Sequence, residues 1–111
     1  LSINGGDLKK AEQMSFKTVQ AEPKNATYLD TYAWILFMQK RFTEAKIYVD
    51  QAIKNDTDSV MNSVILEHAG DIHAQLGDTK TALYYWYKAL KLGSGNTAIL
   101  EKKIRLKKYI K

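Results

Sequence analysis

The feature that most constrains the fold is a spacing of small and large side chains that recurs in two segments. In each segment an alanine is followed four positions later by a large residue and seven positions later by a second alanine. The two sets are Ala45, Val49 and Ala52, and Ala82, Trp86 and Ala89. Residues spaced in this way share one face of an α-helix. The small residues let a second helix approach closely while the large residue fills the gap, so the pattern predicts packed pairs of helices.

Apolar residues recur at helical spacing along almost the whole chain, and no segment alternates as a strand would. Start and stop signals divide the chain into six predicted helices. They cover about residues 7–22, 26–39, 43–54, 60–76, 79–92 and 98–109. Asn25 and Thr43 are suitable N-caps, and Gly77 suits the left-handed position at a helix end. We therefore expect an all-α protein made of helical hairpins with short turns.

The composition supports this class and excludes several kinds of site. The 111 residues are 45% hydrophobic, enough for a buried core, and they include one proline and six glycines, few for an all-β protein. There is no cysteine, so disulfides, zinc–thiolate sites and cysteine nucleophiles are excluded. No apolar run approaches the roughly 20 residues that a membrane helix needs.

The net charge of +5 comes from residues 97–111. This segment has one acidic residue, Glu101, whereas the acidic and basic residues before it cancel at eleven each. Its six basic residues are Lys102, Lys103, Arg105, Lys107, Lys108 and Lys111. Such a segment can attract nucleic acid or anionic lipid. It also suits the polar outer face of a helix that closes a repeat array, and we prefer this interpretation.

The last two helices allow specific expectations about packing. Trp86 lies on both apolar faces of the fifth helix and is expected in the core. Tyr85 and Tyr87 flank it and are expected to be largely covered, whereas Tyr84 is expected on the outside. The last helix carries an imperfect apolar stripe with lysines interleaved. The stripe consists of Ile99, Leu106 and Ile110, broadened by Leu100 and Ile104.

The hairpins repeat along the chain. The alanine that opens the packing pattern recurs after 37 residues, from Ala45 to Ala82, and a weaker copy begins 34 residues earlier at Ala11. Ser15 and Thr18 complete that weaker copy. The first helices of the hairpins also share a pattern. Its members are Leu29, Tyr32-Ala33 and Leu36 in one hairpin, and Leu66, Ala69-Gly70 and His73 in the next.

These residues, at a period near 34, resemble the tetratricopeptide repeat family. Gly77-Asp78 matches the family's turn between helices, and Glu22-Pro23-Lys24-Asn25 matches its junction between repeats. Lys40-Arg41 departs from the pattern, because the family often has Gly-Asp there. The resemblance covers nearly the whole chain. It implies an α-α superhelix, that is, a solenoid of helix–turn–helix hairpins with a C-terminal capping helix.

The resemblance also implies an organisation of the chain. We expect a single domain over residues 1–111 that is a C-terminal fragment of a longer array. Its expected parts are a partial repeat at 1–24, repeats at 25–58 and 59–96, and a basic capping helix at 97–111. The resemblance has a bacterial character. No targeting signal is visible, so both the bacterial cell envelope and the cytoplasm remain open as compartments.

Such an array is expected to hold a protein or peptide in a concave groove lined by the first helix of each hairpin. The residues that should line it are Thr27, Asp30, Thr31, Trp34, Phe37 and Met38 from one hairpin, and Glu67, His68, Asp71 and Gln75 from the next. Trp34 is the strongest candidate for an anchor, since the core already receives the opposite face of its helix. Asp30, Glu67 and Asp71 favour a partner with basic and apolar side chains.

The chain shows no arrangement typical of catalysis, a cofactor or a metal. His68 and His73 are five residues apart and lack the i, i+4 spacing of helical zinc sites. The Gly-Ser-Gly at 93–95 follows no strand and lacks a P-loop lysine, so a helix end and turn explain it. We therefore expect a non-enzymatic protein without cofactor or metal.

Two other functions remain open. One is a structural or self-associating segment of a longer solenoid, because Met14, Phe16 and Val19 near the N-terminal end lack a complete partner hairpin. The other is binding of nucleic acid or an anionic membrane through the basic last helix, which we consider the less favoured partner class.

Overall fold

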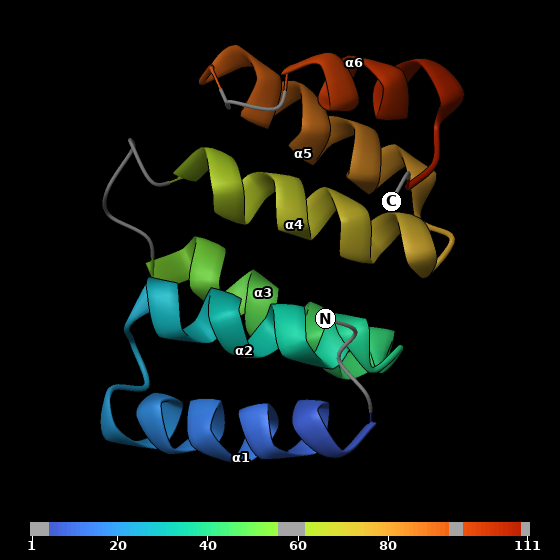
Figure 1. The fold of residues 1–111 in the computed structure, drawn as a ribbon. Helices are drawn as coiled ribbons and strands as arrows, with labels where there is room; N and C mark the ends of the chain where they lie inside the picture. Colours follow the sequence, from blue (N-terminus) through green and yellow to red (C-terminus); the bar gives the residue numbers. More distant parts are fainter. Residues whose placement is uncertain (1–4, 56–61, 94–96, 110–111) are drawn as a thin grey trace. The chain divides into compact units, whose positions relative to one another are not determined.

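The computed structural model describes residues 5–55, 62–93 and 97–109, and these form six α-helices and no strand (Figure 1). The helices are α1 (Gly5–Ala21), α2 (Ala26–Met38), α3 (Phe42–Asn55), α4 (Asn62–Gln75), α5 (Thr79–Lys91) and α6 (Thr97–Leu106). The predicted all-α class is confirmed. The chain forms two compact units, the first over Leu1–Asp56 and the second over Thr57–Lys111.

In the first unit, α2 and α3 form a hairpin and α1 packs against α2. The predicted packing face of α3 is fully buried, namely Ala45, Val49 and Ala52. The predicted core face of α2 is buried as well, namely Leu29, Tyr32, Ala33 and Leu36. The Tyr32 ring also contacts Phe16 of α1 and Tyr48 of α3, with centroids 5.5 and 4.7 Å away. The small-and-large pattern therefore closes this hairpin as the sequence predicted.

In the second unit, α4 and α5 form the equivalent hairpin and α6 packs against α5. Trp86 is fully buried, as predicted, between Ala82 and Ala89 on the packing face of α5. Its indole lies directly over Gly70 of α4, where any Cβ atom would overlap the ring. The glycine is needed here for close approach of a large ring to the backbone, because no larger residue would leave room.

The helix ends follow local chemistry. Asn25 caps α2 as predicted, since its Oδ1 accepts a hydrogen bond from the backbone N–H of Tyr28 at 3.0 Å. Thr43 is not the N-cap of α3. The helix already begins at Phe42, because the carbonyl of Arg41 accepts the first helical bond from Ala45 at 3.0 Å.

The turns of the two hairpins have the same geometry despite different sequences. Gly77 has the predicted left-handed conformation with φ of +84°, and Lys40 has a similar φ of +63°. Each turn is closed by a bond that spans five residues, from Asp78 N to His73 O at 3.0 Å and from Arg41 N to Leu36 O at 2.9 Å. Lys40 therefore adopts a conformation that glycine adopts more easily.

Two packing predictions for the second unit were wrong. Tyr87 is 57% exposed, because a side chain one position beyond Trp86 is turned about 100° away from the face that meets α4. In α6, Ile99 and Leu106 are exposed, whereas Leu100 and Lys103 are buried. The buried face of α6 therefore includes Leu100, which broadens the predicted stripe, but not Ile99 and Leu106. The predicted stripe member Ile110 lies outside the described residues.

Candidate protein-interaction surface

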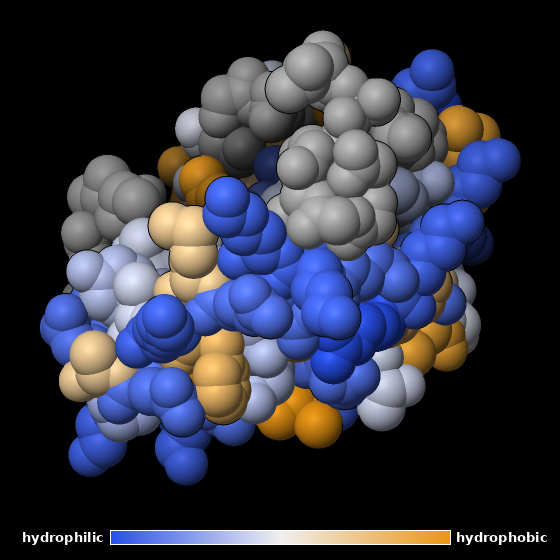
Figure 2. Space-filling view, turned by 60° about the horizontal axis from the view of Figure 1, so that its bottom comes forward, coloured by the Kyte–Doolittle hydropathy of each residue, from blue (hydrophilic) through white to orange (hydrophobic). Residues whose placement is uncertain are grey.

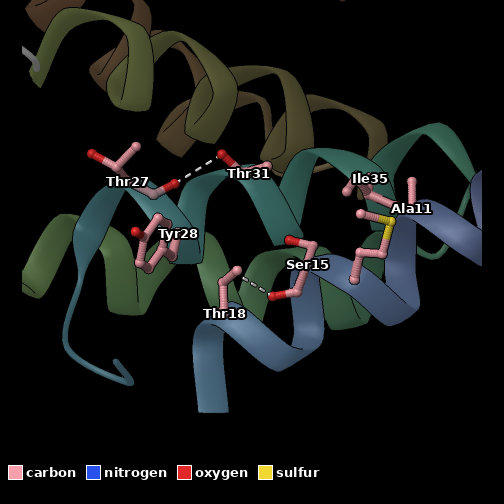
Figure 3. Close-up of a pocket in the computed structure, with 8 residues that line it drawn as sticks. Ala11, Ser15, Thr18, Thr27, Tyr28, Thr31 and Ile35 are labelled. Carbon is pink, nitrogen blue, oxygen red and sulfur yellow. Dashed lines mark hydrogen bonds between the residues drawn. The ribbon is translucent and has the colours of Figure 1, made fainter. Parts of the chain in front are cut away.

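An open groove of about 460 Å³ lies between α1 and α2 in the first unit (Figure 3). It is lined by Ala11, Met14, Ser15 and Thr18 from α1 and by Thr27, Tyr28, Thr31 and Ile35 from α2. The lining is almost entirely apolar although five of these residues carry hydroxyl groups. The hydroxyl of Thr18 donates to the carbonyl of Ser15 at 2.6 Å, and that of Thr31 donates to the carbonyl of Thr27 at 2.9 Å. These two threonine hydroxyls thus have hydrogen-bond partners within their own helices.

Polar side chains join α1 to the turn between α2 and α3. Arg41 Nη1 donates to Glu12 Oε2 at 2.8 Å, and its other nitrogens pair with Glu44 at 2.9 and 2.6 Å. Gln39 Nε2 donates to the carbonyl of Leu8 at 3.3 Å. Burial alone would raise the pKa of Glu12, but hydrogen bonds from Arg41 and Gln39 outweigh it and lower this pKa.

Figure 2 brings forward the face on which α1 lies, and this face is mainly hydrophilic, with hydrophobic areas in separate places. Met14 is the most exposed large apolar side chain of the described residues, at 63%, and it borders the groove. An exposed apolar side chain beside an apolar groove is typical of a surface that binds another molecule.

The predicted groove residues of α2 lie in different environments. Thr27 and Thr31 line the groove between α1 and α2, and Met38 is exposed on the same helix. Asp30 and Phe37 are buried. Trp34 is half-buried, and its ring stacks on Phe37 with centroids 4.5 Å apart and an interplanar angle of 14°. An accessible surface on α2 is therefore built mainly from the threonines and Met38 rather than from Asp30.

The predicted residues of α4 are largely engaged within the second unit. Asp71 is only 2% exposed and accepts hydrogen bonds from Trp86 Nε1 at 3.1 Å and from Lys103 Nζ at 2.8 Å. Glu67 accepts a second bond from Lys103 Nζ at 3.1 Å. His68 is half-buried and Gln75 is exposed. Both acidic residues thus bind a lysine of the same chain.

The pKa of Asp71, the buried acid of this network, is shifted from its ordinary value. Burial raises the pKa of Asp71 to about 6, although the charge of Lys103 and the hydrogen bonds from Lys103 and Trp86 act in the opposite direction. Tyr109 lies next to the same network, with Lys103 Nζ 5.3 Å from its ring centroid, and burial raises the pKa of its phenol. Asp71 is therefore a structural acid rather than one presented to a partner.

A solved structure with a similar fold is the N-terminal domain of stress-induced protein-1 (STI-1) from C. elegans. Its TM-score is 0.74 and its sequence identity is 21%, and the match covers 92% of this chain and 82% of that chain. The chain has the tetratricopeptide-repeat fold. No protein-family model matches the sequence, and no curated protein matches it either.

The tetratricopeptide-repeat resemblance assigned no role in the site to two residues, one that pairs with the predicted acidic residues of α4 and one that lines the groove. Lys103 is 3% exposed and joins α6 to α4, although the sequence suggested a solvated basic helix. Its position three residues after Leu100, on the buried face of α6, was the available signal. Ser15 is 8% exposed, and its hydroxyl oxygen has no hydrogen-bond partner among the described residues. It lies between Ala11 and Thr18, at the centre of the weaker copy of the packing pattern.

Within the described ranges, no three histidine or acidic residues are arranged so that they could hold a metal ion. None of the helices searched there has the length and apolar character required to cross a bilayer.

Proposed function

We propose that this repeat domain is a non-enzymatic protein-interaction module that holds a protein or peptide partner in the groove between α1 and α2. The observation that carries the proposal is an open, apolar groove whose wall includes Thr27 and Thr31, two of the residues expected to contact a partner. The tetratricopeptide-repeat fold supports it, because stacked helical hairpins commonly offer extended binding surfaces.

The chemistry of the groove favours apolar side chains in the partner. The acidic residues Asp30, Glu67 and Asp71 led us to expect basic side chains in the partner. However, Asp30 and Asp71 are buried, and Lys103 binds both Glu67 and Asp71. A buried acid that is already paired offers little attraction to an added cation. The apolar lining and exposed Met14 therefore support an apolar anchor in the partner more strongly than a basic one.

The test is selection of binders from an unbiased peptide library on the immobilised protein, followed by affinity measurements with two variants. Thr31→Arg places a long charged side chain in the groove, and we expect it to weaken selected binders at least tenfold. Thr43→Arg introduces the same residue at an exposed position of α3 and serves as the control. Equal binding to both variants, or no enriched peptides from the folded protein, would contradict the proposed function.

A second candidate is self-association through α1. It is favoured by the exposure of Met14 and Phe16 on this helix, since exposed apolar side chains are buried when copies associate. Light scattering at increasing protein concentration would show a rising mass in this case. A Met14→Lys variant should then remain monomeric at concentrations at which the wild type associates.

A further inference from the structure

We propose that the occupant of the α1–α2 groove is an amphipathic α-helix of a partner protein, with acidic residues along one edge and a polar side chain near its centre. This inference rests on the proposed function and specifies the partner's chemistry. Three observations carry it: the repeat pattern of α1, the environment of Ser15 and the lysines that border the groove.

The internal repeat shows what covers this kind of surface. The packing face of α3 is covered by α2, and that of α5 is covered by α4, and the small residues on both faces are fully buried. The equivalent face of α1 consists of Ala11, Ser15 and Thr18, and all three line the groove. Thr18 is exposed and Ala11 is half-buried. A helix in the groove would give this face the same type of neighbour that its two counterparts have.

Ser15 indicates what the centre of that helix should carry. Its hydroxyl oxygen is buried and has no hydrogen-bond partner among the described residues, which is costly unless a partner supplies one. The larger Trp86 lies over Gly70, whereas its smaller repeat counterpart Val49 occurs in the hairpin that has Ala33 at the position equivalent to Gly70. Ser15 is smaller than Val49 and Trp86, so the facing residue can be larger than alanine. Asparagine or glutamine would satisfy both conditions.

The lysines beside the groove indicate which charge one edge of the docked helix should carry. Lys10 lies four residues before Met14 and Lys17 lies three residues after it, so both border the side of the groove that Met14 lines. Both lysines are exposed. Two acidic residues about two turns apart on the docked helix would pair with them.

The test uses a synthetic, lactam-constrained helix of about 15 residues, long enough for four turns. It carries leucines on one face, a central asparagine, and glutamates along one edge, and a second peptide carries lysines in place of the glutamates. We expect the glutamate peptide to bind the full chain, with NMR shifts confined to residues of α1 and α2 that line the groove. Lys10→Glu/Lys17→Glu should weaken it about tenfold, because two exposed ion pairs are lost.

Matched variants separate this inference from its alternatives. Lys9→Glu/Lys54→Glu makes the same change in net charge at exposed positions away from the groove and should bind normally. The lysine peptide should bind the Lys10→Glu/Lys17→Glu variant better than the wild type, and replacing the central asparagine by leucine should weaken the glutamate peptide. Thr18→Arg should abolish binding of either peptide.

Several outcomes would overturn the inference. These are equal binding of the two peptides to the wild type, no binding of either, or NMR shifts outside α1 and α2. A concentration-dependent mass that Thr18→Arg abolishes would assign the groove to a second copy of the chain. If the library instead gives extended peptides that Thr31→Arg excludes, the proposed function stands and the helical occupant is wrong.

Discussion

In each unit, ion pairs join a third helix to the hairpin, and the two sets of ion pairs differ in their exposure to solvent. In the first unit, Arg41 binds Glu12 and Glu44 at the protein surface, with the arginine side chain 37% exposed. In the second, Lys103 binds Glu67 and Asp71 in the interior, where Lys103 and Asp71 are each 3% exposed. A helix packed against a hairpin can thus be joined to it by either a solvated or a desolvated ion pair.

This difference reverses the direction of the pKa shifts. Hydrogen bonds from Arg41 lower the pKa of Glu44, and they also outweigh the effect of burial on Glu12. For Asp71 burial dominates and raises the pKa. A partly exposed ion pair is close to neutral for stability, whereas a buried one depends on both partners being present. The second unit should therefore be the more sensitive to single changes in its ion pair.

The largest expected effect is that of Lys103→Met. It leaves Asp71 buried without its cation, and we expect it to destabilise the second unit by about 4 kcal/mol. Arg41→Ala, the counterpart in the first unit, should cost about 1 kcal/mol or less. Hydrogen exchange of amides in each unit measures the two effects separately. The double variant Asp71→Asn/Lys103→Met should recover much of the loss. Equal costs for Lys103→Met and Arg41→Ala would show that the proposed contrast between the units is wrong.

A smaller effect is expected where the hairpins differ in packing. Gly70→Ala places a methyl group against the Trp86 ring, and we expect a loss of about 2 to 3 kcal/mol in the second unit. Ala33→Gly, the reverse change at the equivalent position of the first unit, should cost only about 1 kcal/mol, mainly through helix propensity. Hydrogen exchange in α4 and α5 for Gly70→Ala, and in α2 and α3 for Ala33→Gly, gives the comparison. Unchanged protection in Gly70→Ala would mean that the indole can move aside.

The pH dependence of the two units should differ in sign. Burial raises the folded-state pKa of Asp71 to about 6, so the folded state favours the protonated carboxyl group. The contribution of this group to the free energy of unfolding is therefore largest below its unfolded pKa and is lost as the pH rises through 6. We expect the second unit to lose about 2 kcal/mol between pH 4 and pH 7 from this group. Glu12 and Glu44 have lowered pKa values, so their stabilisation of the first unit is present above their unfolded pKa and is lost on acidification. Carboxyl NMR titrations would test this, and a midpoint for Asp71 below 4 would contradict it.

The smallest expected effect concerns the turns. Lys40→Gly relieves a left-handed conformation and should stabilise the first unit by about 0.5 kcal/mol, the gain being reduced by the greater entropy of glycine in the unfolded chain. Gly77→Lys, the reverse change in the second unit, should cost about 1 kcal/mol. Thermal unfolding with hydrogen exchange in each unit measures both. A destabilising effect of Lys40→Gly would mean that the lysine side chain contributes an interaction that outweighs the strain.

The sequence predicted the helices and the hairpin cores because these follow from short-range periodicity. Ala45, Val49 and Ala52 could be assigned to a packed face without knowing their neighbours, and so could Ala82, Trp86 and Ala89. The same periodicity failed for Tyr87 and for the stripe of α6. There two adjacent faces of one helix were both apolar, and only the position of the next helix selects between them.

The candidate site could be predicted only in part. The sequence placed Thr27 and Thr31 on the accessible side of α2, and both line the groove. It treated Asp71 and Glu67 as groove acids and Lys103 as part of a basic tail, whereas the structure joins these three residues. Lys103 lies 32 positions from Asp71 and 36 from Glu67, so no local pattern connects it to the two acids.

Local spacing of small, large and polar side chains by itself determined that this chain forms helices, that the helices pair, and where the turns lie. These properties depend on backbone geometry over a few residues. Tertiary structure decided which charges meet, which apolar face is covered and where a groove stays open. Burial and electrostatic pairing depend on distances between residues far apart in the chain, and packing alone sets those distances.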